Sequence, residues 1–378
     1  MSSFGFPPEP TGDMLAYMVS TTSHTTDACV GHGGVDESQS ATDARYRGYV
    51  DPWDQQELKW RALSHDDGAL VRPDGHGYPV RSGVTRFVAY NNPTDAWILD
   101  RLGVPRASGG EAQSQESVDS FGFQWNWDSN PRTEEDLLWR VAERFKLAPS
   151  AFAGKRVLDA GCGAGAQSRF LAKAGAIVSS VDLSSAVDSA ARLPELRRSR
   201  LAQADIAHLP FPQAAFDIVY CEGVLQHAAA TEPVLAEFAR VLAPGGLLLA
   251  THYLIPKGLL RTARWTVQEW LRGRAQQIPR DWLFLVSGIA AAAALAPGIG
   301  WFLRESVVPC NRRMMTLKAT WSNVYDSYGQ HKFQRHLRPE EFVAAIRDAG
   351  FERGETSEGG LVRAVKRPSG SRQVGGTP

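Results

Sequence analysis

The chain has 378 residues but only four cysteines, and its charge shows no excess of either sign. The cysteines are Cys29, Cys162, Cys221 and Cys310. Their wide spacing excludes a disulfide framework and a Cys-x-x-Cys metal pair, so we expect a reducing, cytoplasmic environment. The 41 basic and 41 acidic residues cancel, which excludes a broad positive field for nucleic acid. The N-terminus has no apolar run, so we expect no secretory signal.

Polar tails flank a chain of ordinary globular composition. Hydrophobic residues make up 43% and charged residues 22%, which is enough apolar material for a sizeable core. Residues 1–45 and 367–378 are polar and lack periodicity, so we predict that both are disordered. His24, Cys29 and His32 lie in the first tail without a second ligand cluster, and we therefore expect no metal site.

The most informative stretch is Val157 to Gly165. A short apolar strand leads through Asp159 into a loop in which every second position is glycine, and a helix pattern follows. Glycines let a backbone approach a bound molecule closely, and the start of the helix offers unpaired N–H groups to an anionic group. The loop alone also fits the dinucleotide pattern, as Gly161-x-Gly163-x-x-Ala166, so it indicates a nucleotide-type cofactor without choosing which one.

Acidic residues follow the next predicted strands at similar places. The strand at residues 177–181 ends in Asp182, whose carboxylate can accept both hydroxyls of a ribose. The strand at 200–203 leads to Asp205, which can accept from an adenine amino group beside the apolar Ile206. Because strands and helices of this length alternate, we predict an α/β fold with a doubly wound, mostly parallel sheet.

These motifs together resemble the core of the class I S-adenosylmethionine-dependent methyltransferases over residues 155–255. Phe216-Asp217 and Pro244-Gly245-Gly246 complete the family signature in the expected order. The resemblance implies a Rossmann-like fold with a seven-stranded sheet and S-adenosyl-L-methionine as cofactor. The cofactor-binding residues that it implies are Asp159, Gly161, Cys162, Gly163, Gly165, Asp182, Leu183, Asp205, Ile206 and Cys221. Asp159 and the glycines would hold the methionine portion, Asp182 and Leu183 the ribose, and Asp205 and Ile206 the adenine.

Residues 46–120 form a small β-rich segment in this prediction. Residues 77–88 alternate apolar and polar side chains around a turn, and they resemble the last hairpin of the small zinc-ribbon domain that often accompanies methyltransferases. The cysteine pairs of that ribbon are absent between Leu63 and His76, so we expect a metal-free segment that is held by its core.

Aromatic side chains occupy every second position from Phe121 to Trp127. The alternation predicts a strand, and residues 121–150 continue with a helix that Thr133 caps. Two interpretations stand. The segment packs on the edge of the catalytic domain, or it is an aromatic arm that closes over the cofactor or substrate, since aromatic faces attract a sulfonium cation. A similar Phe-Gly-aromatic-x-Trp segment occurs in a bacterial small-molecule methyltransferase subgroup, which the chain resembles through to Phe351.

Residues 256–318 interrupt the sheet with an apolar and basic insert. Residues 282–303 are uncharged over 22 positions, long enough to span a bilayer. However, the strands expected within residues 319–366 must complete the sheet begun before the insert, so both flanks lie on one side, and Pro297 breaks the run. We predict a helical lid or hairpin over the substrate pocket, with shallow peripheral membrane contact through residues 256–303 as the alternative.

Methyl transfer to oxygen or carbon usually needs a base that removes a proton, and a histidine suits this best near neutral pH. His227 is the first candidate, because the loop after the fourth strand opens where ligands bind in doubly wound sheets. In the resembling family a second histidine often precedes this position, where the chain has Gln226. His252 and Tyr253, at the end of the fifth strand, are the second choice. A third set comprises Tyr325, Tyr328, His331 and His336.

We therefore predict an enzyme of secondary metabolism that methylates an oxygen or carbon of a small, apolar metabolite. The alternatives are a NAD-dependent oxidoreductase and a non-catalytic cofactor-binding scaffold. Nucleic acid is not an expected substrate. Enzymes that methylate amino groups of nucleic acids have an Asn or Asp, two prolines and an aromatic residue after the fourth strand to hold a flipped base, and this chain has a different sequence there, residues 221–224. We expect a cytoplasmic protein, with peripheral membrane contact and a homodimer as open alternatives.

Overall fold

The computed structural model describes residues 44–88, 92–108, 115–127, 132–306, 316–329, 334–356 and 360–368. Nearly all of the two predicted tails lies outside these ranges, including His24, Cys29 and His32. Cys310 and His331 also lie outside the described residues.

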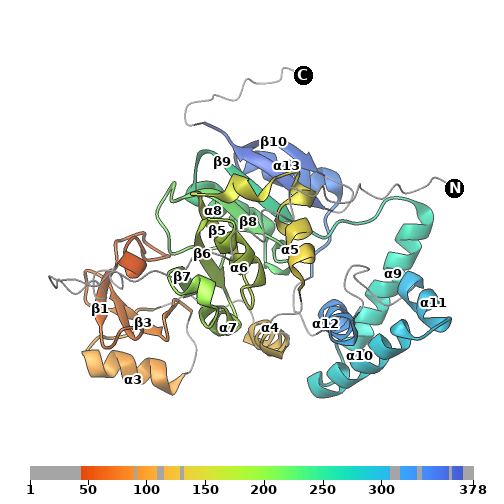
Figure 1. Cartoon of the computed structure of the whole chain (residues 1–378), viewed down its shortest axis with the longest axis horizontal. Coiled ribbons are helices and arrows are strands. Elements are labelled where there is room, and N and C mark those ends of the chain that lie inside the picture. Colours follow the sequence, from red (N-terminus) through yellow and green to blue (C-terminus); the bar gives the residue numbers. More distant parts are fainter. Residues whose placement is uncertain are drawn as a thin grey trace, which may run out of the picture. The chain divides into compact units, whose positions relative to one another are not determined.

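A mixed sheet organises the part of the chain that the structure describes (Figure 1). Its eleven strands follow the order β1-β2-β3-β4-β7-β6-β5-β8-β9-β11-β10 in this part. The strands are β1 (Lys59–Ala62), β2 (Gly68–Val71), β3 (Gly77–Arg81), β4 (Val84–Arg86), β5 (Arg156–Ala160), β6 (Ile177–Asp182), β7 (Arg200–Gln203), β8 (Phe216–Cys221), β9 (Leu242–Thr251), β10 (Phe351–Thr356) and β11 (Leu361–Lys366).

The strands from β7 to β10 in this order form the predicted seven-stranded core. Strands β7, β6, β5, β8 and β9 run parallel, whereas β11 pairs antiparallel with β9 and β10. The strand order reverses between β5 and β8, so the loops after these two strands open side by side at the carboxyl edge of the sheet. This confirms the predicted α/β, doubly wound architecture.

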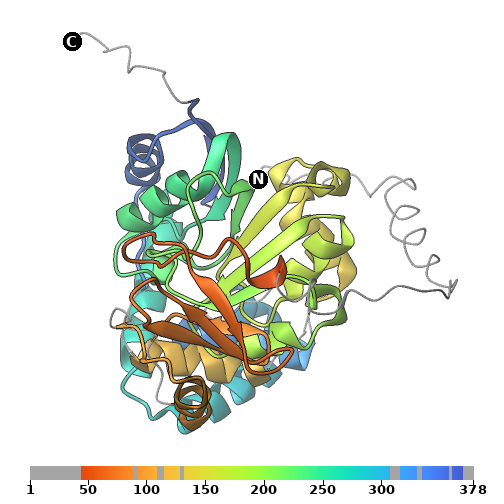
Figure 2. The same ribbon diagram turned by 90° about the vertical axis from the view of Figure 1, so that its left-hand side faces the viewer.

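The N-terminal strands continue this sheet (Figure 2). Strands β3 and β4 form the predicted hairpin, and its turn residues Ser82 and Gly83 have φ angles of 51° and 77°, as a tight two-residue turn requires. Strand β4 pairs in parallel with β7, with Val84 opposite Leu201, and helix α3 (Pro93–Leu102) packs on β2 and β3. The sequence analysis treated residues 46–120 as a separate β-rich segment. The pairing of β4 with β7 could not be foreseen, because backbone hydrogen bonds between distant strands do not depend on the alternation of side chains.

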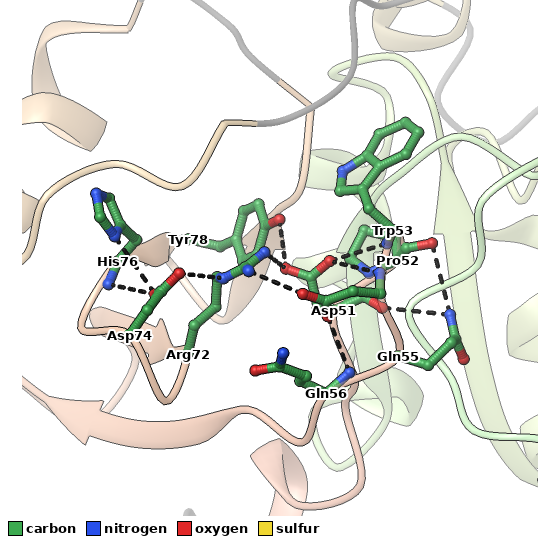
Figure 3. Close-up of polar contacts among 10 residues, drawn as sticks. Asp51, Pro52, Trp53, Gln55, Gln56, Arg72, Asp74, His76 and Tyr78 are labelled. Carbon is green, nitrogen blue, oxygen red and sulfur yellow. Dashed lines mark hydrogen bonds and ion pairs between the residues drawn. The ribbon is translucent and has the colours of Figure 1, made fainter.

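The loop before β1 is held by the fully buried carboxylate of Asp51 (Figure 3). Its Oδ2 accepts from Arg72 Nη1 at 2.6 Å and from the Tyr78 hydroxyl at 2.8 Å, and its Oδ1 accepts from the Trp53 backbone N–H at 2.9 Å. Arg72 also pairs with Asp74, so one guanidinium ties this loop to the β2–β3 hairpin. Within the described residues, no group of three or more His, Cys, Asp or Glu side chains could hold a metal ion. The zinc-ribbon resemblance itself stays a prediction.

Some helices pack on the faces of the central sheet, and others pack on one another away from it (Figure 1). The helices are α4 (Gln115–Trp127), α5 (Glu134–Val141), α6 (Ala166–Lys173), α7 (Val187–Ala191), α8 (Thr231–Val241), α9 (Leu259–Ala275), α10 (Arg280–Leu295), α11 (Ile299–Ser306), α12 (Leu317–Tyr328) and α13 (Pro339–Asp348), with short 3-10 helices η1 (Glu143–Phe145), η2 (Pro149–Phe152), η3 (Pro194–Leu196) and η4 (Leu225–His227). Along β5, Leu158 and Ala160 point into the core that includes residues of α8 and α13. The intervening Asp159 points to Ser168 of α6 on the opposite face.

The aromatic segment is a helix, and the prediction of a strand at 121–127 is wrong. Within α4, Phe121 and Trp125 are one turn apart, and so are Phe123 and Trp127, so every-second spacing puts two aromatic pairs on two sides of the helix. Gly122 lets this helix approach the loop after β6 closely, because a Cβ atom there would lie 2.8 Å from the Ser185 hydroxyl.

The insert folds as the helices α9, α10 and α11, and α10 packs on α11 and α12. The run of residues 282–303 is divided between α10 and α11, with Pro297 and Gly298 between them, as the sequence predicted. None of the described helices combines the length and apolar character needed to cross a membrane. Helix α12 also contacts α9 and α4, so the insert reaches α4 through α12 (Figure 1).

Candidate active site

The glycine loop folds tightly onto the end of β6. The backbone N–H groups of Gly161 and Cys162 both donate to the Val181 carbonyl, at 2.8 and 3.0 Å. Gly161 and Gly163 have φ angles of 85° and 51°, a left-handed conformation that favours glycine. A Cβ atom on Gly161 would lie only 2.2 Å from the side chain of Val224, in the loop after β8. The loops after β5 and β8 are therefore in direct contact at the point where the strand order reverses.

Asp182 closes this loop from the end of β6. Its Oδ2 accepts from the Gly163 N–H at 2.7 Å, and its Oδ1 accepts from the backbone N–H and the hydroxyl of Ser184 at 2.8 and 2.6 Å. Burial raises the pKa of this carboxyl, although the Ser184 and Gly163 hydrogen bonds oppose the shift. The structure thus brings together two predicted elements, the glycine loop and the ribose-binding acid.

Asp159 lies beneath the loop, fully buried. Its Oδ2 accepts from the Ser168 hydroxyl of α6 at 2.6 Å, and the Ser168 hydroxyl is 2.8 Å from that of Ser180. Burial raises the pKa of Asp159 to about 7, against the opposing effect of the Ser168 hydrogen bond. The carboxyl group therefore positions the start of α6. Above neutral pH it is also ionised and places a negative charge beneath the glycine loop.

The turn after β7 is fixed beside β6. The Ala204 N–H donates to the Asp182 carbonyl at 3.0 Å, and Gln203 Nε2 donates to the Leu183 carbonyl at 3.1 Å. Asp205 Oδ1 accepts from the Ala207 N–H at 2.8 Å, and the neighbouring Ile206 is buried. The predicted ribose and adenine residues therefore lie on adjacent strand ends.

The two cysteines of the predicted cofactor set are side chains of the core. Cys162 packs with Val84, Val187 and Leu201, and Cys221 belongs to the large core cluster under α8. Burial raises the pKa of both thiols well above the ordinary value, so neither is a nucleophile at neutral pH. If these two residues contact a ligand, they can do so only through their backbone atoms.

Sequence reasoning missed Glu222, which directly follows β8. Its Oε1 pairs with Arg140 Nη1 of α5 at 2.7 Å and with Arg144 Nη1 of η1 at 2.8 Å, and its Oε2 accepts from the Tyr220 hydroxyl at 2.8 Å. Burial alone would raise the pKa of Glu222, but the two guanidinium groups outweigh it and hold the pKa well below the ordinary value. The arginines come from far along the chain, so no local signal marks this cluster.

Helix α4 lies over the glycine loop. A Cβ atom on Gly163 would be 3.6 Å from the Trp125 ring, which is ordinary contact distance. Asn126 donates to the Ser185 hydroxyl at 3.3 Å and accepts from the Ser189 hydroxyl at 2.8 Å, which ties α4 to the segment after Asp182. This placement favours the aromatic-arm interpretation over edge packing.

A row of rings continues from α4 along the carboxyl edge of the sheet. The Phe121 ring centroid is 5.0 Å from that of His227, which is 6.1 Å from Tyr253. Tyr253 is 5.5 Å from His336, and His336 is 5.4 Å from Trp265 of α9. The row joins the loop after β8 and the end of β9 to the insert.

The structure does not bring His252 into this row. Its ring Nε2 is 3.2 Å from the Thr231 hydroxyl, its Nδ1 is 2.9 Å from the Tyr253 carbonyl, and it packs against Phe342 of α13. Burial lowers the pKa of His252. Consecutive residues of an extended chain point to opposite faces, which separates the side chains of His252 and Tyr253.

The third set of candidates is divided. Tyr325 is fully buried and faces Phe284 of α10, and Tyr328 packs in the small apolar cluster of α10 and α12. His336 lies in the ring row, where burial and the charge of Arg272 lower its pKa to about 4. At neutral pH His336 is therefore uncharged and a weak base.

Comparisons with known proteins agree with this arrangement. Residues 158–250 match the family model described as "Methyltransferase domain". The 27-O-demethylrifamycin SV methyltransferase of Amycolatopsis mediterranei (strain S699) is 33% identical over 142 residues, which are 35% of this chain and 52% of that protein. The demethylmenaquinone methyltransferase of Tropheryma whipplei (strain Twist) is 35% identical over 127 residues, or 32% of this chain and 51% of that protein.

A further relative is the malonyl-[acyl-carrier protein] O-methyltransferase of Serratia marcescens, 37% identical over 109 residues, or 29% of this chain and 42% of that protein. Among solved structures, phosphoethanolamine N-methyltransferase 2 of Haemonchus contortus has a TM-score of 0.40 at 19% identity, with 64% of this chain and 44% of that chain covered. The chain spans about half the length of the curated relatives that it matches.

The fold and the loop geometry define a Rossmann-like domain that binds a nucleoside cofactor at the carboxyl edge of its sheet. Residues 158–250 place the domain among the class I S-adenosylmethionine-dependent methyltransferases, whose cofactor is S-adenosyl-L-methionine. The described residues fit that cofactor. Trp125 covers the glycine loop, and three carboxyl groups stand at successive strand ends.

Proposed function

We propose that this protein transfers a methyl group from S-adenosyl-L-methionine to an oxygen or carbon of a small, apolar metabolite. The observation that carries the proposal is the meeting of the glycine loop with Asp182 beneath Trp125, within a methyltransferase domain. Relatives named for acting on 27-O-demethylrifamycin SV and demethylmenaquinone support a small-molecule acceptor.

In this proposal Asp182 and Leu183 hold the ribose, Asp205 and Ile206 the adenine, and the glycine loop the methionine portion. The cofactor supplies an electrophilic methyl group on a sulfonium cation. The carboxyl groups of Asp159 and Asp182 favour such a cation by simple Coulomb attraction. Trp125 shields the site from water and offers its ring face to positive charge.

The same geometry argues against a dinucleotide. The N–H groups of Gly161 and Cys162 donate to Val181, and that of Gly163 donates to Asp182, so these three donors already have acceptors in the protein. A pyrophosphate would need such donors and would lie above the buried carboxyl of Asp159. These three N–H groups are therefore not available to an anion, and the expectation that the start of α6 offers its N–H groups concerns other donors and stays a prediction.

His227 is the residue that we propose as the base. Its ring stands in the row between Phe121 and Tyr253, at the mouth of the loop after β8. Burial raises the pKa of Tyr253, so its phenol keeps its proton and can donate a hydrogen bond to the acceptor. The weakly basic His336 can accept a hydrogen bond but is poorly suited to remove a proton.

We also propose that the insert makes peripheral contact with an anionic membrane surface. Residues 257–306 carry seven basic and three acidic side chains, a net charge of +4, although the whole chain is neutral. Three tryptophans of the same insert are largely exposed to solvent: the exposed fractions of Trp270, Trp282 and Trp301 are 60, 64 and 65%. Exposed aromatic and aliphatic side chains among arginines are typical of helices that lie in a lipid interface. A second copy of the chain is the competing occupant of this surface.

The central proposal is tested by incubating the protein with methyl-labelled S-adenosyl-L-methionine and a host metabolite extract, followed by mass analysis of labelled products. His227→Ala should lower the rate by about 10²–10⁴-fold, the usual contribution of a positioned base, with unchanged affinity for S-adenosylhomocysteine. His65→Ala removes an exposed histidine of the β1–β2 turn and serves as the matched control. Tight binding of NADH without binding of S-adenosyl-L-methionine would favour the oxidoreductase alternative instead.

A further inference from the structure

Four buried side chains near the ring row keep polar atoms that lack a hydrogen-bond partner among the described residues. They are Ser120 Oγ, Gln124 Oε1, both amide atoms of Gln226, and the Tyr325 hydroxyl. All four residues are at most 2% exposed. Buried polar groups in folded proteins are nearly always paired, so several orphaned groups in one place indicate a binding surface rather than ordinary core. We call these four residues the buried polar cluster.

Two helices carry most of the cluster. Ser120 and Gln124 are one turn apart on α4, so they lie on one side of that helix. Gln124 Nε2 donates to Asp326 Oδ1 of α12 at 3.3 Å, which leaves the Gln124 carbonyl as the orphaned atom. The Ser120 hydroxyl is close enough to Tyr325 to oppose the rise that burial causes in its pKa, but their geometry makes no hydrogen bond.

Gln226 lies in the loop after β8, directly before His227, whose ring centroid is 5.0 Å from that of Phe121 of α4. The Gln226 amide lies close enough to the Tyr253 phenol to influence the pKa of that group, which Asp326 of α12 also influences. Neither amide atom of Gln226 has a partner in hydrogen-bonding geometry among the described residues. Ser120 directly precedes Phe121 and Gln226 directly precedes His227, so the contact between these two rings brings Gln226 near the α4 side of the cluster.

The cluster adjoins the proposed methyl-transfer site. Gln226 directly precedes His227 in η4, and the same loop presses Val224 against Gly161. On the opposite side, α4 carries Trp125 over Gly163 and Phe121 against His227. A molecule that binds the cluster would thus lie beside the candidate base.

The chemistry of the cluster selects its ligand. The orphaned atoms are all uncharged, and they include both donors and acceptors, so they suit a group that offers a hydroxyl and a carbonyl together. Rings of Phe121, Phe123 and Tyr253 stand around them, which favours a flat molecule. The carboxyl group of Asp326 disfavours a carboxylate or phosphate in the same place.

Building on the proposed function, we infer that the buried polar cluster binds the oxygen-bearing end of the methyl acceptor, and that the acceptor is an uncharged aromatic ring with a hydroxyl group beside a carbonyl. The ortho-hydroxyaryl ketones are the simplest members of this class. Gln226 is the specificity-determining residue, because its amide can donate to the carbonyl and accept from the hydroxyl of one ligand.

The first measurement compares two buried glutamines. Gln226→Leu should leave the urea midpoint of unfolding unchanged or raised, because the substitution removes polar atoms that have no hydrogen-bond partner among the residues described. Gln203→Leu is the matched control, since Gln203 is equally buried but accepts from Arg86 at 3.1 Å and donates to Leu183 at 3.1 Å. Gln203→Leu should therefore lower the midpoint. An equal loss for Gln226→Leu would show that its amide is structurally paired and would overturn the inference.

The second measurement is the affinity of the protein for aromatic ketones, determined by calorimetry in the presence of S-adenosylhomocysteine. We expect ortho-hydroxyacetonaphthone to bind about tenfold more tightly than acetonaphthone, which lacks the hydroxyl, and Gln226→Leu to abolish this difference while it binds S-adenosylhomocysteine normally. Equal binding of the two ketones, binding of neither, or tighter binding of ortho-hydroxynaphthoic acid overturns the inference and leaves the proposed function standing. Failure of the wild-type protein to bind S-adenosylhomocysteine overturns both.

Discussion

Alanine in place of Gly161 tests the contact between the loops after β5 and β8. The new Cβ atom would lie 2.2 and 2.7 Å from the two methyl groups of Val224, closer than packed atoms can come. Gly154→Ala is the matched control, because Gly154 also has a positive φ angle, 69° against 85°, but nothing lies within 4 Å of its Cβ position. The two substitutions share the backbone strain and differ in the clash.

The magnitudes follow from these two contributions. A non-glycine residue in the left-handed region costs about 1–2 kcal/mol, and the stiffer unfolded chain returns about 0.4–1 kcal/mol, so Gly154→Ala should destabilise by about 1 kcal/mol. Overpacking adds about 1–3 kcal/mol at Gly161. Val224→Ala removes both clashing methyl groups, so most of this added loss should disappear when Gly161→Ala is made in that background.

Urea unfolding of the wild type, Gly161→Ala, Val224→Ala and the double variant forms a double-mutant cycle. We expect a coupling free energy of about 1–3 kcal/mol between residues 161 and 224. Equal losses at Gly161 and Gly154, or a coupling near zero, would refute the contact. Gly163→Ala completes the series, because its Cβ would meet only the Trp125 ring at 3.6 Å. It should cost no more stability than Gly154→Ala but should weaken S-adenosylhomocysteine binding, since the new methyl group fills the space between loop and ring.

Glu222→Gln should lower the free energy of unfolding by about 3–5 kcal/mol at neutral pH, because it removes the buried carboxylate that pairs with Arg140 and Arg144, of which only Arg140 keeps a second carboxylate partner among the described residues, Asp136. The pKa of Glu222 is depressed in the folded state, so its contribution is present above its ordinary value of 4.5 and is lost as the pH falls further. The difference between wild type and variant in urea should shrink accordingly, and a difference that is constant with pH would contradict the assignment. For the insert, co-sedimentation with vesicles should require anionic lipid, weaken with salt and be reduced by Trp282→Ser. Concentration-dependent dimerisation without lipid binding would instead identify a second copy as the occupant.

The aromatic segment shows where sequence patterns stop being informative. Spacing of every second residue fits a strand, yet it equally leaves Phe121 and Trp125 a full helical turn apart, and only packing between the glycine loop and α12 selects the helix. The pairing of β4 with β7 is similar, because backbone hydrogen bonds join residues more than a hundred positions apart. The same distance hides the partners of Glu222.

The cofactor loop, the acids at the strand ends and the seven-stranded core could be predicted from the amino-acid sequence alone. Glycines in left-handed conformations and short apolar strands that end in aspartate are local features, and local features are written in consecutive residues. The tertiary structure alone decided which polar side chains face one another. It turned His252 toward α13, set His227 beside Phe121, and buried the Gln226 amide group without a hydrogen-bond partner in the described part of the chain. Those outcomes depend on the close packing of segments that are distant in the chain, and no short stretch of residues encodes them.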